Sequence, residues 1–582
     1  MGKESCLTFV TSFISIYEND STDKRYTVDW RFENFIEIAK TGIQFCIYVS
    51  PDCYERLFSM TQQYSNIKIM NQVVLDETDT VKTCKNIEYA LPELRDPKKD
   101  TEKYMFIMNT KSEFLRDAVE KNPWDSTHFA WIDFSISYIF KDKERTLEYL
   151  RVLSKRYFAP SFFAIPGCWD KLDVNNGPVY LNKVNWRFCG GFYLADRESM
   201  KQYCDLYREH FSEFMQTHKK LVWEVNFMAW LEAAKGWSPY WYKADHNDSI
   251  FYVPTQFWAR CLDKDLVKVE YKYPHLENFL PSSASYLYCG GKHILNTRYV
   301  NYSYSPEGRY IIYDYHKILH SKNVCSILDD ETMEPTSFDF MDDTTVGLPS
   351  KNQFSHGLED MRVYEEDGLV KFVASNVNYV PDGQIRILNG IYDVDTRTYK
   401  ECRILNPPTN TRCEKNWIPL PNNDRPNDIQ FNDIQPFKEG GKGGNSPLPL
   451  IYTWNPYQLG KINPETNQLE IILSKQIKSP EFHRVRGSTT FIEDGDVLIG
   501  VVHFSEEFVP RQYYHILVTL DKNTLVPIKY SEPFCFQHFG VEFCIGFTIR
   551  NGKYIFWLSK KDNHAIMVNI DREKIDICFD IV

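Results

Sequence analysis

The sequence predicts two domains in series, an α/β domain followed by an all-β domain. In residues 1–250 strands alternate with helical stretches, an order typical of an open, largely parallel sheet with helices on both faces. From about residue 285 the helical periodicity largely disappears, and short strands recur between turn signals. So many hairpins over ~300 residues favour a β-propeller or a large sandwich. We place the two domains at residues 1–275 and 285–582.

The elements of the first half follow one another with clear boundaries. Strands are predicted at "CLTFVTSFI", "IQFCIYVS", "IKIMNQVVL" and "FAWID", the last of which ends at Asp133. Amphipathic helices are predicted at "RFENFIEIAKTG", "PDCYERLFSMTQQY" and "KSEFLRDAVEKNP", bounded by Gly42, Pro51 and Pro123. Ligands of such sheets bind beyond the carboxyl ends of the strands. Asp133 would lie there.

The second half is predicted to be built from hairpins. The dipeptides Asp367-Gly368, Asp494-Gly495 and Asn551-Gly552 each stand between two extended runs. An Asx-Gly pair in that position is a strong signal for a tight turn between antiparallel strands.

Composition excludes several classes of function. The 582 residues are too many for one core, and ~150 residues per domain suggests two to four domains. The net charge of −12 argues against a nucleic-acid partner, and no apolar run reaches the ~18 residues of a transmembrane segment. We expect no signal peptide. The 15 scattered cysteines lack a C-x-x-C pair, which favours reduced thiols in a cytoplasm, or in the host cytoplasm if the source is a virus.

Polar residues of the first half stand where a ligand of the sheet would bind. Thr11 and Ser12 end a strand, and Asn109 and Lys111 are expected between a strand and a helix, where a lysine could meet a diphosphate. Further along the chain come the pair Gly190 and Gly191, Glu224 at the head of an apolar helix, and His246 after a strand. Each has a structural alternative: Asp133 as a strand-end cap, the glycine pair as a bulge, Glu224 as a helix N-terminal charge and His246 as a hydrogen-bond partner.

Five stretches carry a resemblance to a known family. In this order, "TSF", "FIMNTKSEFL", "FAWIDFS", "FCGGF" and the helix of Glu224 resemble the HtrL/YibB family of bacterial glycosyltransferases, which is similar to the GT-A fold of nucleotide-sugar transferases. The resemblance spans about residues 1–260. It implies a nucleotide-sugar donor bound by Thr11, Ser12, Asn109, Lys111, Gly190 and Gly191. It also implies a divalent metal (Mn²⁺ or Mg²⁺) held by Asp133 and His246, and Glu224 as a catalytic base or acceptor-orienting group.

The second half contains four clusters of charged and polar residues, "HGLEDMRV", "EKNWIPLP", "RVRGSTTFIEDGDVLIGVVHF" and "RQYYHILVTLD", and a late "WLSKKDNHAIMV". Their order resembles the five-bladed propeller of β-mannoside phosphorylases and the related β-1,2-mannosyltransferases. "EDMR" is similar to that family's E-D-P-R motif, with Met361 in place of proline. The resemblance implies Asp360 as the general acid. It implies a sugar- or phosphate-binding shell of Glu359, Arg362, Lys415, Asn416, Arg486, His503, Tyr514 and Asp562.

Together these observations predict a glycosyltransferase that moves a sugar from a nucleotide-sugar donor to a glycan acceptor. Its propeller either carries a second glycosyl-transfer or phosphorolysis site or grips the acceptor. Two alternatives stay open. One is a carbohydrate-binding protein whose catalytic sites are inactive, in which the propeller cluster is a set of salt bridges or a glycan-binding site. The other is a β-mannoside phosphorylase with a scaffolding first half. The sequence indicates neither the donor sugar nor the oligomeric state.

Overall fold

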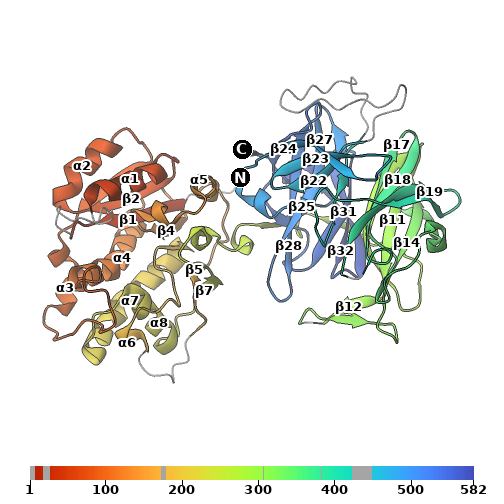
Figure 1. The fold of residues 1–582 in the computed structure, drawn as a ribbon. Helices are drawn as coiled ribbons and strands as arrows, with labels where there is room; N and C mark the ends of the chain where they lie inside the picture. The colour runs from red at the N-terminus through yellow and green to blue at the C-terminus, as the bar shows by residue number, and fades with distance from the viewer. Residues whose placement is uncertain (1–6, 17–26, 172–178, 306, 382, 422–447) are drawn as a thin grey trace. The chain divides into compact units, whose positions relative to one another are not determined.

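A computed structural model describes residues 7–16, 27–171, 179–305, 307–381, 383–421 and 448–582 (Figure 1). The contacts between residues divide the chain into two units, Met1–Trp258 and Ala259–Val582. This division falls earlier in the chain than the boundary expected at 275–285. None of the helices within the described ranges is long and apolar enough to cross a membrane.

The N-terminal unit is a mixed α/β structure around a seven-stranded sheet of order β3-β2-β1-β4-β6-β5-β7. Strand β1 is parallel to β2 and β4, β2 is parallel to β3, and β5 is parallel to β7, whereas β6 is antiparallel to β4 and β5. The strands are β1 (Leu7–Phe13), β2 (Gln44–Val49), β3 (Ile67–Gln72), β4 (His128–Ile132), β5 (Phe163–Gly167), β6 (Phe192–Asp196) and β7 (Tyr240–Lys243). The start of β6 therefore lies at the same edge as the carboxyl ends of the other strands.

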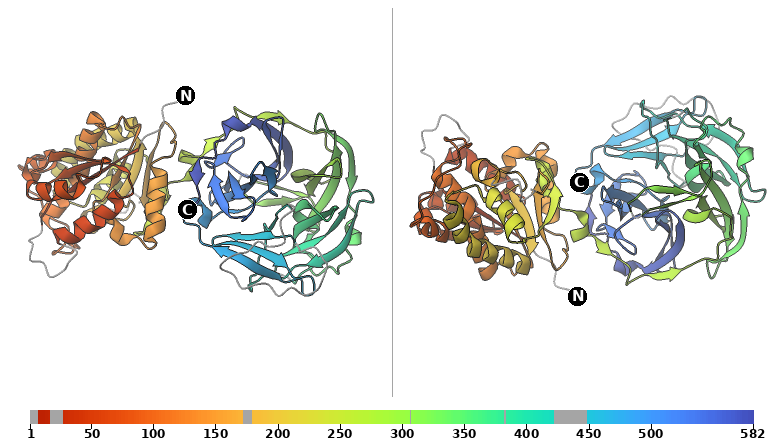
Figure 2. Two further views of the ribbon diagram at one scale, coloured as in Figure 1. Left: turned by 90° about the horizontal axis from the view of Figure 1, so that it is seen from above. Right: turned by 90° about the horizontal axis from the view of Figure 1, so that it is seen from below.

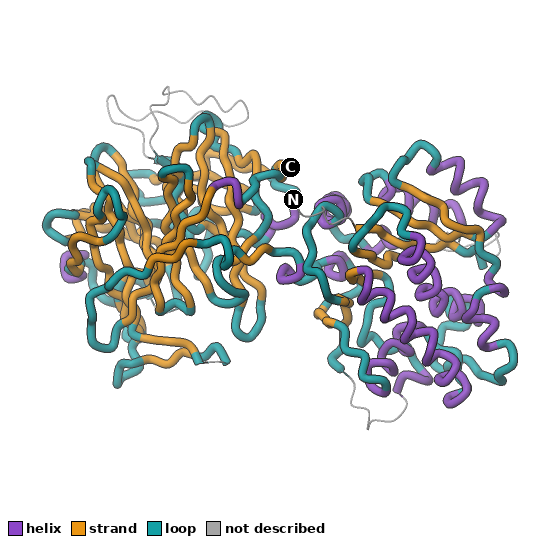
Figure 3. The backbone as a smooth tube through the Cα atoms, turned by 180° about the vertical axis from the view of Figure 1, so that it is seen from behind, coloured by secondary structure: helices purple, strands orange, loops and turns teal. Residues whose placement is uncertain are grey.

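Helices are concentrated in this unit (Figure 3). They are α1 (Val28–Ala39), α2 (Pro51–Thr61), α3 (Asp79–Cys84), α4 (Glu102–Lys121), α5 (Lys143–Leu153), α6 (Val179–Asn182), α7 (Arg197–His218) and α8 (Glu224–Ala234). The Thr101 side chain accepts a hydrogen bond from the Tyr104 N–H and so caps α4. Because the helix begins there, Asn109 and Lys111 lie inside it. The expectation that they lie between a strand and a helix was wrong.

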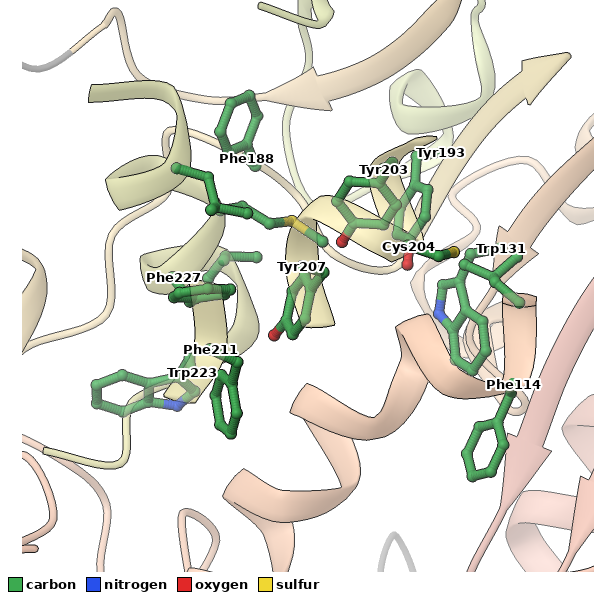
Figure 4. Close-up of a cluster of buried hydrophobic side chains, with 14 of the residues drawn as sticks. Phe114, Trp131, Phe188, Tyr193, Tyr203, Cys204, Tyr207, Phe211, Trp223 and Phe227 are labelled. Carbon is green, nitrogen blue, oxygen red and sulfur yellow. The ribbon is translucent and has the colours of Figure 1, made fainter. Parts of the chain in front are cut away.

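An aromatic core packs α4, α7 and α8 together and against the sheet (Figure 4). Tyr207 of α7 contacts Phe227 of α8, with ring centroids 4.6 Å apart, and donates a 2.6 Å hydrogen bond to Asn109 of α4. Burial of large aromatic side chains is the main source of stability in such a core, and edge-to-face pairs add to it. The core therefore fixes the two helices that carry Lys111 and Glu224.

The C-terminal unit is a propeller-like arrangement of sheets around a common centre (Figure 2). One sheet joins β10 (Leu280–Cys289), β11 (Lys292–Val300), β14 (Leu319–Leu328), β15 (Pro335–Phe340) and β16 (Ser355–His356). A second joins β17 (Leu358–Glu366), β18 (Leu369–Asn376), β19 (Arg386–Asp393) and β20 (Thr398–Ile404), and a third joins β21 (Ile418–Pro419), β22 (Leu450–Trp454), β23 (Tyr457–Ile462) and β24 (Leu469–Lys475). The short β12 (Tyr302–Tyr304) and β13 (Tyr310–Ile312) pair with each other.

Two further sheets contain strands from both the beginning and the end of this unit. One joins β8 (Arg260–Cys261), β25 (Arg486–Gly487), β26 (Ile492–Asp494), β27 (Val497–Glu506), β28 (Gln512–Asp521), β29 (Pro527–Tyr530), β30 (Phe534–Cys535) and β34 (Phe579–Asp580). The other joins β9 (Val267–Val269), β31 (Glu542–Arg550), β32 (Lys553–Lys560) and β33 (His564–Asp571). Because β8 and β9 complete sheets made from the end of the chain, residues 259–275 group with this unit. The predicted propeller arrangement is found, and the count of five blades stays a prediction.

Candidate functional site

A cavity of about 590 Å³ opens in the N-terminal unit at the carboxyl-end edge of its sheet. This is where open α/β sheets bind ligands. The predicted site residues that line it are Ser12, Lys111, Asp133, Gly190, Gly191, Glu224 and His246. The fold thus brings together predicted residues from β1, α4, the end of β4, the start of β6, the start of α8 and the segment after β7.

Asp133 directly follows β4 at the mouth of this cavity. Its backbone N–H donates to the carbonyl of Gly191 over 2.9 Å, which continues the β4–β6 pairing by one residue. Its Oδ1 accepts hydrogen bonds from Trp131 Nε1 at 2.8 Å and lies 2.9 Å from Lys111 Nζ. No described residue donates to Oδ2, and the carboxylate is 40% exposed. One oxygen of Asp133 is thus held in place while the other faces the cavity.

Lys111 is a buried cation between two carboxylates. Its Nζ lies 2.7 Å from Glu224 Oε1, 2.9 Å from Asp133 Oδ1 and 2.9 Å from the carbonyl oxygen of Gly190. Burial acts to lower the pKa of Lys111, but the two carboxylates outweigh it and the pKa is raised. Since an ammonium has three N–H donors and all three have acceptors here, Lys111 orders the site rather than presenting a free cation to a diphosphate.

Glu224 is the first residue of α8 and is almost fully buried. The position favours a carboxylate because the helix N-terminus carries partial positive charge. Gly190 fits tightly against it: a Cβ at Gly190 would lie 2.3 Å from Glu224 Oε1. A Cβ at Gly191 would lie 2.9 Å from Ile136 Cδ1 and 3.5 Å from Asp133 Oδ2. Gly190 is therefore required for the close approach of this segment to Glu224, whereas at Gly191 the tight contact is with Ile136.

Two of the residues predicted to bind the donor do not reach the cavity. Asn109 is fully buried, donates to the carbonyls of Met105 and Val222 and accepts from Tyr207. These bonds tie α4 to the start of α8, so its role is to hold the core together. Thr11 is also fully buried within β1, whereas its neighbour Ser12 lines the cavity. The strand alternation places successive side chains on opposite faces.

His246 lines the same cavity, but its nearest polar groups belong to a different cluster. Its Nδ1 lies 3.7 Å from Cys168 Sγ and 3.7 Å from Asp245 Oδ1, and its ring contacts Trp186 edge-on at 4.1 Å. Burial lowers the pKa of His246, with an opposing effect of Asp245, so the imidazole is neutral near pH 7. His246 is thus a neutral imidazole beside the thiols of Cys168 and Cys189.

Other cavity-lining residues were missed by the sequence analysis. Arg31 donates to Ser135 Oγ over 3.3 Å, and Lys99 also lines the wall. Trp30 and Tyr138 form an aromatic pair with centroids 5.5 Å apart on the same wall. Arg31 and Trp30 sit in the first turns of α1, and nothing in an amphipathic helix pattern distinguishes such residues from ordinary surface positions.

A second polar cluster lies in the C-terminal unit, built around Arg298 of β11. Arg298 Nη1 lies 3.1 Å from Asp360 Oδ1 and Nη2 lies 3.5 Å from Glu359 Oε1, while Nε donates to Ser321 Oγ. Lys415 reaches Glu359 Oε2 at 3.4 Å. Arg298 was not predicted, because a single arginine in the strand "HILNTRYV" has no sequence signal.

Asp360 lies at an irregularity of the β17–β18 pairing, between Glu359 and Arg362, and has a φ of +49°. Asn416 and Asp562 also have positive φ, at +65° and +57°. Asp and Asn tolerate this left-handed region better than other non-glycine residues. At this irregularity, a feature that can redirect a side chain, Asp360 lies against Arg298.

Arg362 is buried, and its N–H groups donate hydrogen bonds to other groups of the protein. It donates to the carbonyl oxygens of Ser488, Asp360 and Gly487 and to Asn416 Oδ1. Burial lowers the pKa of Arg362 to about 10. The guanidinium therefore joins β17 to β25 and to the segment before β21, and the expectation that it binds a sugar conflicts with these bonds.

Further residues of this cluster come from β27, from β28 and from Ser488, which directly follows β25. Ser488 Oγ lies 3.3 Å from His503 Nδ1, and Tyr513 stacks on His503 with centroids 5.9 Å apart. Burial, together with His515, Arg362 and Arg486, lowers the pKa of His503 well below 6.5, so the ring is neutral. Tyr514 was the wrong choice: it is fully buried in the hydrophobic core, and its OH donates to Gln512. Arg486 is exposed.

Asp562 completes this cluster from the turn between β32 and β33. Its Oδ2 accepts a 2.9 Å hydrogen bond from the Tyr304 OH. Burial raises the pKa of Asp562, and Arg298 only partly opposes this. Burial also acts to raise the pKa of Asp360, but Arg298, Lys415 and Arg362 outweigh it and the pKa is lowered. The two carboxyl groups are thus driven towards opposite protonation states.

The chain was compared with known protein families, curated proteins and solved structures. Residues 5–220 match the model of a family described as "Bacterial protein of unknown function (HtrL_YibB)", which confirms the predicted resemblance over fewer than half of the 582 residues. A search of curated protein sequences found no match.

Among solved structures, the chain is similar to a β-1,2-mannobiose phosphorylase from Listeria innocua (12% identity, 53% of this chain and 98% of that chain covered, TM-score 0.34). It is also similar to a GDP-Man-dependent mannosyltransferase from Leishmania mexicana (12% identity, 53% and 88% covered, TM-score 0.33). A third is a glycosyl hydrolase from Bacteroides ovatus (10% identity, 52% and 87% covered, TM-score 0.35). Identities this low transfer no activity.

Proposed function

We propose that the N-terminal unit is a GT-A glycosyltransferase that moves a sugar from a nucleotide-sugar donor to a glycan acceptor. The observation that carries the proposal is the joined set of Asp133, Lys111 and Glu224 on the wall of the cavity. Strand order 3-2-1-4-6-5-7 with β6 reversed supports the GT-A assignment, because it brings the ends of β1 and β4 and the start of β6 to one edge.

In this proposal the donor diphosphate lies near Ser12, Asp133 and the glycine pair. Asp133 Oδ2 would hold a divalent cation, Mn²⁺ or Mg²⁺, which would neutralise the charge of the leaving diphosphate. Arg31 and Lys99 add positive charge on the cavity wall, and Trp30 with Tyr138 offers aromatic surface to a base or sugar. Glu224 orients the acceptor hydroxyl from the wall beside Gly190.

The test is hydrolysis of a panel of nucleotide-sugars with Mn²⁺, comparing the wild-type chain with Asp133→Asn. Asparagine keeps the shape of the side chain but removes its charge. Asp205→Asn is the matched control, because Asp205 forms an exposed i,i+3 pair with Arg208 on α7. We expect activity in the wild type and the control and its loss in Asp133→Asn. Equal activity in all three would exclude this site.

A second candidate function is favoured by the cluster of the C-terminal unit. We propose that its five sheets of four or more strands are the five blades of a propeller and that this cluster binds and processes a β-mannoside-type glycan. Residues from five sheets converge on it, and two carboxyl groups have pKa shifts of opposite sign. The exposed tyrosines Tyr310, Tyr313 and Tyr315 follow Tyr304, which donates to Asp562, and offer sugar-stacking surface.

The chemistry needs one carboxylic acid if phosphate is the nucleophile. A phosphate oxygen attacks the anomeric carbon, the glycosidic C–O bond breaks, and the acid gives its proton to the leaving oxygen. The resemblance of "EDMR" to the phosphorylase motif implies Asp360 as this acid. Burial raises the pKa of Asp562, whereas Arg298 and Lys415 lower that of Asp360. Because these shifts favour proton uptake by Asp562 over Asp360, and both groups belong to the same cluster, we propose Asp562 as the proton donor.

Phosphate-dependent release of mannose 1-phosphate from β-mannosides is the measurement, with the variants Asp360→Asn and Asp562→Asn. The control is Asp395→Asn, which alters an exposed pair with Lys292. Loss of release in both site variants, but not in the control, supports phosphorolysis. Glycan binding without release by the wild type would instead make the propeller a binding module.

A further inference from the structure

Three side chains at one end of the sheet form a cluster that the proposed transferase reaction does not use. They are Cys168, Cys189 and His246, and their ligand atoms all lie within 4.8 Å of one another. Cys168 directly follows β5, Cys189 precedes β6 by three residues, and His246 follows β7 by three. Because β6, β5 and β7 are neighbours and β6 runs antiparallel, these three positions meet at the same edge.

The distances match a tetrahedral zinc site. Zn–S bonds of about 2.3 Å and Zn–N bonds of about 2.05 Å place two thiolate sulfurs about 3.8 Å apart and a sulfur and a nitrogen about 3.6 Å apart. In the structure, Cys168 Sγ lies 3.6 Å from Cys189 Sγ and 3.7 Å from His246 Nδ1. Two of the three spacings thus match those of a tetrahedral site, and the ligand atoms of Cys189 and His246 also lie within 4.8 Å of each other.

A fourth ligand stands beside them. Asp245 Oδ1 lies 4.0 Å from Cys168 Sγ and 3.7 Å from His246 Nδ1, a few tenths of an ångström beyond the spacing a zinc-bound oxygen would have. Asp245 is 77% exposed, so a small rotation brings it in. The backbone N–H of Cys168 donates to Trp186, and that of Cys189 donates to Pro166. These bonds fix the two thiols without using their sulfurs.

We propose that Cys168, Cys189 and His246, with Asp245 as the fourth ligand, bind a zinc ion. Thiolate and imidazole ligands select zinc over Mn²⁺ and Mg²⁺, which prefer oxygen. The ion ties the ends of β5 and β7 to the start of β6, beside Gly190 and Gly191. It therefore fixes one wall of the cavity, and it engages His246, leaving Asp133 as the ligand for the metal of the donor.

The test uses the full chain, reduced, loaded with ZnCl₂ and passed through gel filtration before its zinc is measured. We expect a single equivalent per chain in the wild type and in Cys53→Ser, the matched control, which alters a buried thiol of α2. Cys168→Ser and His246→Asn should weaken zinc binding by more than the ~10–100-fold that loss of a group outside the ligand shell costs. Asp245→Ala should also weaken zinc binding, and because Asp245 is exposed this substitution does not threaten folding.

Cobalt substitution gives a second readout. Tetrahedral Co²⁺ bound to two thiolates shows sulfur-to-metal charge-transfer absorption, which Cys168→Ser should reduce and Cys53→Ser should not. Zinc content no higher in the wild type than in Cys168→Ser overturns the proposal. The proposal is also overturned if the reduced chain takes up zinc only at background level while Cys168 and Cys189 form a disulfide in air. Either result would leave the proposed transferase function untested, because that function is measured separately by nucleotide-sugar hydrolysis.

Discussion

Lys111 Nζ and Glu224 Oε1 lie 2.7 Å apart, although 113 residues separate them in the chain. Both side chains are less than 10% exposed. A buried pair of this kind gives little net stability, because desolvation offsets the attraction, but it becomes costly when one partner is lost. Its position between Asp133 and Gly190 makes it the element that holds the two sides of the cavity in register.

Replacing the cation tests this role. Lys111→Met keeps the length of the side chain but leaves Asp133 and Glu224 without their shared partner, so we expect a loss of about 3–5 kcal/mol in unfolding free energy, measured with urea. The double variant Lys111→Met with Glu224→Gln should recover part of this. Lys121→Met, which removes an exposed i,i+4 pair with Asp117, should cost no more than ~0.5 kcal/mol. Equal losses in both lysine variants would contradict the buried-pair interpretation.

Metal binding at Asp133 is expected to depend on the nucleotide. Lys111 already pairs with Asp133 Oδ1, so Mn²⁺ alone meets one partly neutralised carboxylate. A nucleoside diphosphate supplies the missing negative oxygens. Thermal unfolding with Mn²⁺ or nucleotide alone should therefore show little change, whereas both together at ~100 times Kd should stabilise by roughly 2.7 kcal/mol. Asp133→Asn should remove the joint effect, and a full effect of Mn²⁺ alone would refute this prediction.

The two cavity glycines should respond differently to substitution. In Gly190→Ala the new methyl group would lie 2.3 Å from Glu224 Oε1, so Glu224 must move and its pair with Lys111 breaks. We expect lower stability and loss of transfer activity. In Gly191→Ala the methyl group meets the end of the Ile136 side chain and faces Asp133 Oδ2 at 3.5 Å, so we expect weaker donor binding with a smaller effect on stability. Urea unfolding and donor titration separate the two outcomes.

How far the sequence predicts this site depends on the kind of signal. Asp133 could be found because a hydrophobic strand runs straight into it at a sheet edge. The position of Asn109 was wrong because Thr101 caps α4, so that "FIM" is helix and the asparagine turns into the core. Tyr514 was chosen over Tyr513 because a strand pattern does not tell which of two adjacent tyrosines faces a site. Arg298 acts through contacts with residues 61 and 62 positions later, which no local pattern reports.

The opposite pKa shifts of Asp360 and Asp562 predict opposite effects of pH on stability. The folded state raises the pKa of Asp562, so this group destabilises the fold as pH rises from its ordinary 3.8 through the folded pKa. It lowers the pKa of Asp360, so that group contributes stability above pH 3.8 that is lost as pH falls through the folded pKa. Relative to wild type, Asp562→Asn should therefore gain stability with rising pH, and Asp360→Asn should lose it.

Urea unfolding of the two variants and wild type between pH 3 and 8 measures this difference. Asp395→Asn serves as the control, since its carboxylate is exposed and its pair with Lys292 lies on the surface. Parallel pH profiles for Asp360→Asn and Asp562→Asn would mean that the two carboxyl groups share one protonation state. In that case Asp562 would not be favoured over Asp360 as the proton donor, because that assignment depends on the site shifting the pKa values of the two groups apart.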